Sequence, residues 1–234
     1  KVMATIYLHV GAPKTATSTL QRLLAKNYRR LLKQGVLYPK QLRHGDAHHL
    51  LVCDLIKKHR GHTMPDFWYG KKARGVAFSS LLAEIEENAP DLKSVIISSE
   101  LFFAQTNKVE MILEDIRSQL AAHDIKIIVY LRRQDQLYSS FYNQDVKGVR
   151  QWAASADEFY NTHQIFQKNY VEILDAWTIT FGQANIILRP FEEGRLKGGD
   201  IVEDFCSIVG INGLSSDGVN ENDSLGVNQL YLKR

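Results

Sequence analysis

One segment near the start of the chain, residues 5–21, constrains the fold more than any other. Its first part is apolar, as in a buried strand, and its last part has the composition of a helix start. The loop between them carries Lys14 and leads through four hydroxyl side chains, Thr15, Thr17, Ser18 and Thr19. A strand that passes into a helix through such a loop directs backbone N–H groups, a helix dipole and a cation to one place. The segment therefore predicts an anion site, most often one for phosphate.

The composition is that of an ordinary globular protein. The chain has 29 basic and 26 acidic side chains, and its net charge of +3 is too small to indicate nucleic-acid binding. No apolar run approaches the roughly 20 residues of a membrane-spanning helix. The two cysteines, Cys53 and Cys206, form no CxxC motif and no disulfide framework. We expect a cytoplasmic protein with no membrane span and no nucleic-acid partner.

We expect a single domain over residues 1–234, because no linker, repeat or low-complexity block divides the chain. A longer native chain, before Lys1 or after Arg234, is left open. The oligomeric state is not readable from the sequence.

Short apolar runs alternate with segments of helical periodicity. The runs are residues 4–10, 94–98, 126–131 and 184–188, and helical faces recur over 20–32, 112–120 and 166–177. Strands without polar alternation, separated by helices, are typical of a parallel sheet covered on both faces. The sequence therefore predicts a three-layer α/β fold, with a central, mainly parallel sheet flanked by helices.

In such a sheet the ligand site lies beyond the carboxyl ends of the strands. The residues that follow the four predicted strands are the loop 11–19, then Glu100, then Arg132 with Arg133, and then Arg189. Three of these places carry cations and one carries a carboxylate. We expect an anion-binding rim with one potential base.

The first loop is not a Walker A motif, since that pattern places lysine directly after its second glycine. Here Lys14 comes three residues after Gly11, and the hydroxyls follow it. The alternative is an ordinary strand–helix turn whose hydroxyl caps the helix. A cap needs only one hydroxyl, so the larger number favours an anion site.

This loop resembles the 5′-phosphosulfate loop of sulfotransferases that use 3′-phosphoadenosine 5′-phosphosulfate (PAPS). The family pattern is usually Lys-Thr/Ser-Gly-Thr-Thr before a helix, and this chain has Ala16 in place of glycine and Ser18 in place of the second threonine. The resemblance implies a P-loop-kinase-like sulfotransferase architecture. It also implies that Gly11, Lys14 and residues 15–19 bind the donor. Because alanine has a Cβ, we expect a negative φ at Ala16.

A second motif supports the same family. In sulfotransferases an arginine at a strand end and a serine eight residues later grip the 3′-phosphate, and here Arg132 and Ser140 have that spacing. The planar guanidinium suits bidentate phosphate binding. The alternative for Arg132 is a surface ion pair. Arg133 is the weaker candidate and is expected to face solvent.

Glu100 follows Ser98 and Ser99 at the end of another predicted strand. In this family that place carries the catalytic base, a histidine in some branches and a glutamate in others. The resemblance therefore implies that Glu100 accepts the proton of the acceptor, a task that a partly desolvated carboxylate can perform. The alternative is a glutamate that caps a helix or forms a surface ion pair.

Two weaker features fit the resemblance. Phe191, after the last strand, is a candidate for the adenine site, and a core position is the alternative. Residues 222–225 resemble an Asn-x-Ser-Leu element of bacterial sulfotransferase domains.

The histidines at 44, 48 and 49 invite a metal interpretation, together with Asp46 and Cys53. Their spacing fits no standard zinc pattern, so we expect no metal. Contact of His48 or His49 with an acceptor is the other interpretation, and the role of His44 stays open.

The resemblance implies in-line sulfuryl transfer from PAPS to a hydroxyl or amine, with 3′-phosphoadenosine 5′-phosphate (PAP) as product and no metal. The acceptor is a small molecule or a carbohydrate, and Trp68, Tyr69 and Trp152 are candidates to stack on it or to pack in the core. Two alternatives remain. They are a P-loop-kinase-like nucleotide phosphotransferase and a non-catalytic module that binds PAP.

Overall fold

The computed structural model describes residues 3–103, 109–147, 151–163 and 169–215. Its centre is a five-stranded sheet in the order β2-β3-β1-β4-β5, and every pair of neighbours is parallel. The strands are β1 Thr5–His9, β2 Val36–Leu37, β3 Ser94–Ser98, β4 Asp124–Leu131 and β5 Ile186–Pro190. Four of them are the predicted strands. The sequence missed β2, which has only two residues.

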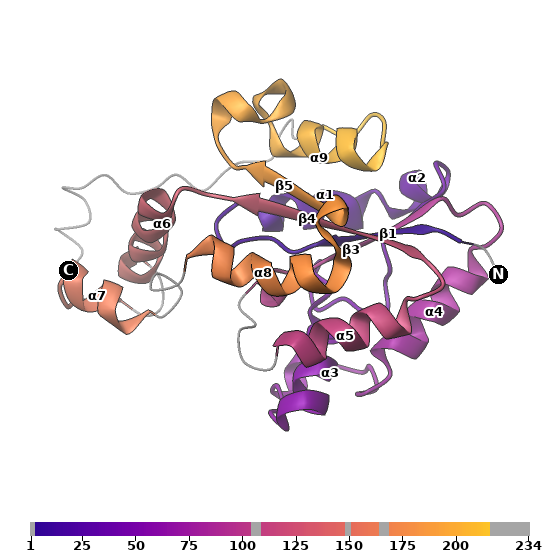
Figure 1. Cartoon of the computed structure of the whole chain (residues 1–234), viewed down its shortest axis with the longest axis horizontal. Helices are drawn as coiled ribbons and strands as arrows, with labels where there is room; N and C mark the ends of the chain where they lie inside the picture. Colours follow the sequence, from indigo (N-terminus) through magenta and orange to yellow (C-terminus); the bar gives the residue numbers. More distant parts are fainter. Residues whose placement is uncertain (1–2, 104–108, 148–150, 164–168, 216–234) are drawn as a thin grey trace.

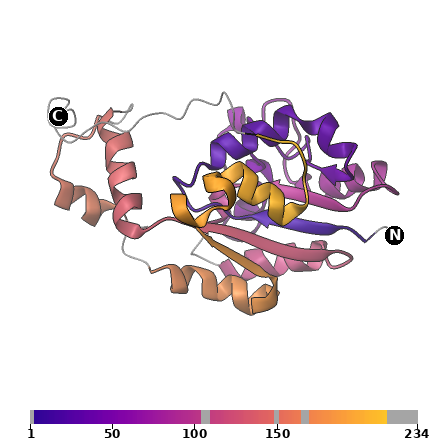
Figure 2. The ribbon, with the colours of Figure 1, turned by 90° about the horizontal axis from the view of Figure 1, so that it is seen from above.

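Helices cover both faces of this sheet (Figures 1 and 2). One face packs on α3 His49–Arg60, α4 Ala77–Glu87, α5 Val109–Gln119 and α8 Tyr170–Phe181. The other packs on α1 Thr17–Lys26, α2 Tyr28–Leu32 and α9 Ile201–Val209. Successive residues of each central strand point to opposite layers, so that Ile6 and Leu8 face the first layer and Tyr7 the second. The predicted three-layer α/β fold is confirmed.

Two helices extend beyond the sheet. Helix α6 Gln134–Lys147 follows β4, and α7 Ala156–Thr162 packs on it around the buried Phe159 (Figure 1). Within the described residues, no helix is both long and apolar enough to span a membrane.

The helical faces of the sequence are observed with changed bounds. The face over 20–32 is divided at Asn27, where α1 ends and α2 begins, and the Asn27 side chain donates to the Leu23 carbonyl. The face over 112–120 is α5. Helix α8 begins at Tyr170, capped by Asn169, while Phe166 lies outside the described residues. Residues 222–225 also lie outside them.

Candidate functional site

The loop after β1 lies at the carboxyl edge of the sheet, between the ends of β3 and β4. Its backbone is held in two left-handed conformations, with φ of 66° at Lys14 and 53° at Ala16. The expected negative φ at Ala16 is therefore wrong. The left-handed turn is unfavourable for a residue with a Cβ, so the surrounding contacts impose it, and such strain collects at functional sites.

The hydroxyls of this loop have different environments. The Thr15 hydroxyl is buried and donates to the Ala12 carbonyl at 2.7 Å, which closes the turn. Thr17 is also buried, yet its Oγ1 has no hydrogen-bond partner among the described residues. Ser18 is exposed, and Thr19 is half-buried.

Gly11 allows the loop to approach the start of α1. A Cβ at this position would lie 2.9 Å from Thr17 Oγ1, closer than real contacts allow. In the described structure no side chain caps α1, and its first turn has no acidic residue. The N-terminal N–H groups and the positive end of the helix dipole are thus available to an anion.

Lys14 lies among other charges. Burial lowers the pKa of its ammonium group, Lys147 and Arg132 lower it further, and Asp145 opposes them. Its Nζ lies 6.0 Å from the centre of the Phe141 ring. Cations that repel one another in a partly buried place favour a bound anion.

Arg132 joins the loop to a neighbouring cavity. Its Nη1 donates to the Lys14 carbonyl at 3.0 Å, and its buried Nε has no partner among the described residues. Arg132 and Phe191 line a cavity of about 640 Å³, with the guanidinium carbon 5.8 Å from the centre of the Phe191 ring. The structure thus brings together three residues that the sequence singled out separately.

Ser140 lies farther along α6. It is half-buried and comes one helical turn after Gln136, which lines the same cavity. Ser140 itself does not line it. Arg133 is exposed, as expected, and pairs with Asp135 at 3.0 Å, and it also lines the same cavity as Arg132.

Arg189 does not belong to the rim, and this part of the prediction is wrong. Strand β5 extends to Pro190, so Arg189 lies within it and faces α9. Its guanidinium pairs with the fully buried carboxylate of Asp204, which also accepts from the Tyr130 hydroxyl at 2.7 Å. Arg189 therefore connects β5 to α9.

The carboxylate of Glu100 is held at both oxygens. Gln21 Nε2, from α1, donates to one oxygen at 3.2 Å, and His49 Nε2, from the start of α3, lies 3.6 Å from the other. The Glu100 side chain is 33% exposed, so a substrate can still reach it. Glu100 does not cap the short helix Glu100–Phe102, because it is the first residue of that helix and Ser99 is the cap.

His49 lies between Glu100 and Ser99. Burial lowers the pKa of its imidazole, although Glu100 acts in the opposite direction, so the ring is neutral near pH 7. Ser99 Oγ accepts from the Leu101 N–H and lies 2.8 Å from His49 Nδ1. In the tautomer whose proton is on Nε2, this N–H faces Glu100 and the Ser99 hydroxyl donates to Nδ1.

No family model matches the chain. The solved structure of a sulfotransferase from Alicyclobacillus acidocaldarius superposes with a TM-score of 0.52 and 16% identity, over 97% of this chain and 88% of that one. This chain has a sulfotransferase-type fold.

Two further matches were found. Mouse sulfotransferase SULT7A1, in complex with PAP, has a TM-score of 0.47 and 14% identity, over 92% of this chain and 61% of that one. An uncharacterized protein from Archaeoglobus fulgidus is 32% identical over 118 residues. That region is 50% of this chain and 30% of the archaeal protein.

In this sulfotransferase-type fold the other histidines have partners of their own. His48 is fully buried, where its Nδ1 accepts from the Ser98 N–H and its Nε2 bonds the Pro39 carbonyl, so it cannot contact an acceptor. His44 Nδ1 lies 3.0 Å from the Trp68 carbonyl oxygen. His48 thus connects the start of α3 to the end of β3, and His44 connects the segment before α3 to the segment between α3 and α4.

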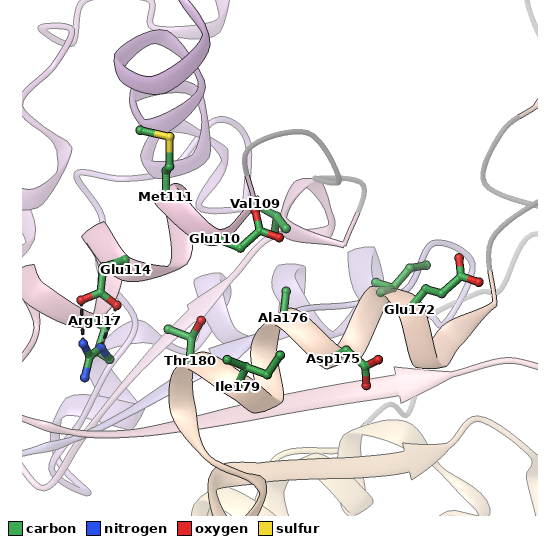
Figure 3. A pocket seen from close by; sticks show the side chains of 11 residues that line it. Val109, Glu110, Met111, Glu114, Arg117, Glu172, Asp175, Ala176, Ile179 and Thr180 are labelled. Carbon is green, nitrogen blue, oxygen red and sulfur yellow. Dashed lines mark hydrogen bonds and ion pairs between the residues drawn. The ribbon is translucent and has the colours of Figure 1, made fainter.

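A larger cavity, of about 750 Å³, lies between α5 and α8 (Figure 3). Its polar groups are mainly carboxylates, and Glu114 is paired with Arg117. None of its lining residues belongs to a strand or to the loops at the carboxyl edge of the sheet. Its cation, Arg117, is paired with Glu114 and is outnumbered by carboxylates, so the smaller cavity at Arg132 is the better candidate for a nucleotide.

Proposed function

We propose that the chain is a sulfotransferase that moves a sulfuryl group from PAPS to a hydroxyl or amine of an acceptor. The observation that carries the proposal is the contact between Arg132 and the Lys14 carbonyl. This contact connects the two predicted phosphate-binding places, which are the loop and the cavity at Arg132. PAPS carries a 5′-phosphosulfate and a 3′-phosphate on its ribose, one for each place. ATP has no 3′-phosphate to bind at Arg132.

Buried polar atoms without partners support the fit of this donor. Thr17 Oγ1 and Arg132 Nε are buried and unpaired among the described residues. Leaving such atoms without hydrogen bonds is unfavourable, and both lie on residues that the family resemblance assigns to the donor. Phosphate oxygens would satisfy them. Phe191 would offer its ring to the adenine, and Ser140 would reach the 3′-phosphate from α6.

The proposed reaction is a direct displacement. The acceptor oxygen or nitrogen forms a bond to sulfur, the bond from sulfur to the 5′-phosphate oxygen breaks, and PAP leaves. Lys14 and the first N–H groups of α1 stabilise the negative charge on the departing oxygen. Glu100 takes the proton of the acceptor, while Gln21 and His49 hold its carboxylate in position.

Thermal unfolding with different nucleotides tests the donor. PAP at about 100 times its Kd is expected to raise the Tm by roughly 5–10 °C. Arg132→Gln should remove most of that shift, because it removes the guanidinium proposed to bind the 3′-phosphate. Arg117→Gln is the matched control, since Arg117 lies on α5, where it pairs with Glu114 away from the carboxyl edge of the sheet.

The same assay separates the alternatives. Stabilisation by ATP with Mg²⁺ but not by PAP would favour a kinase-like phosphotransferase and reject the proposal. Stabilisation by PAP without turnover of PAPS on any acceptor would favour the non-catalytic module.

Substitution of His49 tests how the base is positioned. We expect His49→Leu to lower kcat about 10- to 100-fold, as displacement of a reacting group does. His49→Gln, which keeps an N–H donor, should recover most of the activity. The Tm shift with PAP should be the same in both variants. Equal losses in the two variants would indicate that His49 acts only through packing.

A further inference from the structure

A series of aromatic rings runs from His49, beside the predicted base, into the segment between α3 and α4. The His49 ring centre lies 5.5 Å from that of Trp68 and 6.3 Å from that of His44. His44 and Trp68 are stacked, with ring centres 4.5 Å apart and an angle of 14°. Phe67 extends this group at 6.5 Å from both. We call these four residues, His44, His49, Phe67 and Trp68, the aromatic wall.

The structure distinguishes between the aromatic residues that the sequence suggested for the acceptor. Tyr69 is buried, and its hydroxyl donates to Asp54. Trp152 packs against Phe159 beside α6, in a separate cluster. Trp68 is the candidate that lies next to His49, the residue beside the base, and its neighbour Phe67 is 72% exposed. Phe67 and the half-buried Trp68 together form an exposed apolar surface that a ligand can contact.

The cationic side chains around the aromatic wall have partners within the protein. The Arg43 guanidinium donates to the carbonyls of Tyr38 and Pro39, and the Lys72 ammonium donates to those of Lys40 and Arg43. Arg74 pairs with Asp66. On the other side of the carboxylate, Lys14 and Arg132 form the positive part of the site. The positive side thus suits an anionic donor, and the aromatic side suits an uncharged partner.

We infer that the aromatic wall binds the acceptor, and that the acceptor is an uncharged alcohol with a ring. The inference rests on the proposed function. The ring packs on the exposed parts of Phe67 and Trp68, and its hydroxyl reaches the Glu100 carboxylate over His49. Aromatic rings and the apolar faces of pyranoses share this mode of contact, so the chemistry includes phenols and neutral sugars.

Binding of three probes to the PAP-saturated protein tests the inference, with intrinsic fluorescence and ligand-observed NMR as readouts. The probes are 2-naphthol, methyl β-D-glucopyranoside and the open-chain 1-hexanol. At least one ring probe is expected to bind at least tenfold more tightly than 1-hexanol. Trp68→Leu and Phe67→Ala should each weaken that binding by about tenfold or more. Trp152→Leu is the matched control and should leave it unchanged.

The two ring probes distinguish the sources of the ring, and the variants distinguish the two proposals. Ring binding that does not exceed that of 1-hexanol, or that survives Trp68→Leu, would overturn the inference. A normal Tm shift with PAP in that case would leave the proposed sulfotransferase function intact. Conversely, ring binding that depends on Trp68, in a protein that PAP does not stabilise, would reject the function and keep the aromatic wall as a ring-binding site.

Discussion

Replacement of Glu100 by glutamine is expected to lower kcat by about 10²–10⁴-fold, the usual contribution of a general base. The amide has nearly the same shape as the carboxylate, but only one of its two terminal atoms is an oxygen, so it can accept from Gln21 or from His49 and not from both. It cannot take the proton of the acceptor. PAP binding should therefore stay the same, because Glu100 lies on the opposite side of the loop from Arg132. The measurement is kcat with saturating PAPS, together with the Tm shift by PAP.

Glu110→Gln is the matched control for this prediction. It makes the same chemical change in an exposed carboxylate of the cavity between α5 and α8, and it should leave turnover unaffected. A Glu100→Gln variant with wild-type kcat would show that the base is another residue. If Glu110→Gln reduced turnover instead, the reaction would have to be placed at the larger cavity.

The sheet could be predicted because its signal is local. Each central strand is a short, apolar, β-branched run, and such a run is buried on both faces wherever it pairs. The order of the strands then brought the loop, Arg132 and Glu100 to one edge. This step needs only the rule that parallel strands end together. The positions of the predicted site residues thus followed from pattern and topology.

The sequence-based predictions failed where contacts between residues distant in the sequence determine the structure of the site. Gln21 and Glu100 are 79 residues apart and His49 and Ser99 are 50 apart, so no local pattern could show that they meet. Gln21 is four residues after Thr17 on one face of α1, which is the only signal that could have suggested it. Arg189 was misassigned because its partner, Asp204, lies on a helix that follows it.

Ala16 shows the same limit at the level of the backbone. Its intrinsic preference is a negative φ, and the sequence could supply only that preference. The observed 53° is imposed by the path from β1 to α1, in which Thr15 is bonded to Ala12 and Arg132 to the Lys14 carbonyl. A side-chain motif can therefore predict an anion loop without predicting its backbone geometry.

Replacement of Lys14 by glutamine is the second change with a large expected effect, a loss of about 10²–10³ in kcat, as for one donor at a developing charge. The ammonium group is half-buried, where burial and the neighbouring cations lower its pKa. A charge in such a place acts more strongly than it would in water. The contact of Arg132 is with the carbonyl of residue 14, so the substitution keeps it. The second phosphate grip should therefore persist.

The kinetic pattern separates this role from simple binding. PAP should still raise the Tm of Lys14→Gln, although by less than in the wild type, while kcat falls much more than the affinity does. Lys26→Gln, at the far end of α1, changes the net charge equally and should alter neither quantity. A Lys14→Gln variant that loses PAP affinity and keeps its kcat would show that Lys14 binds the donor without assisting the departure of PAP. Charge stabilisation would then fall to the N–H groups at the start of α1.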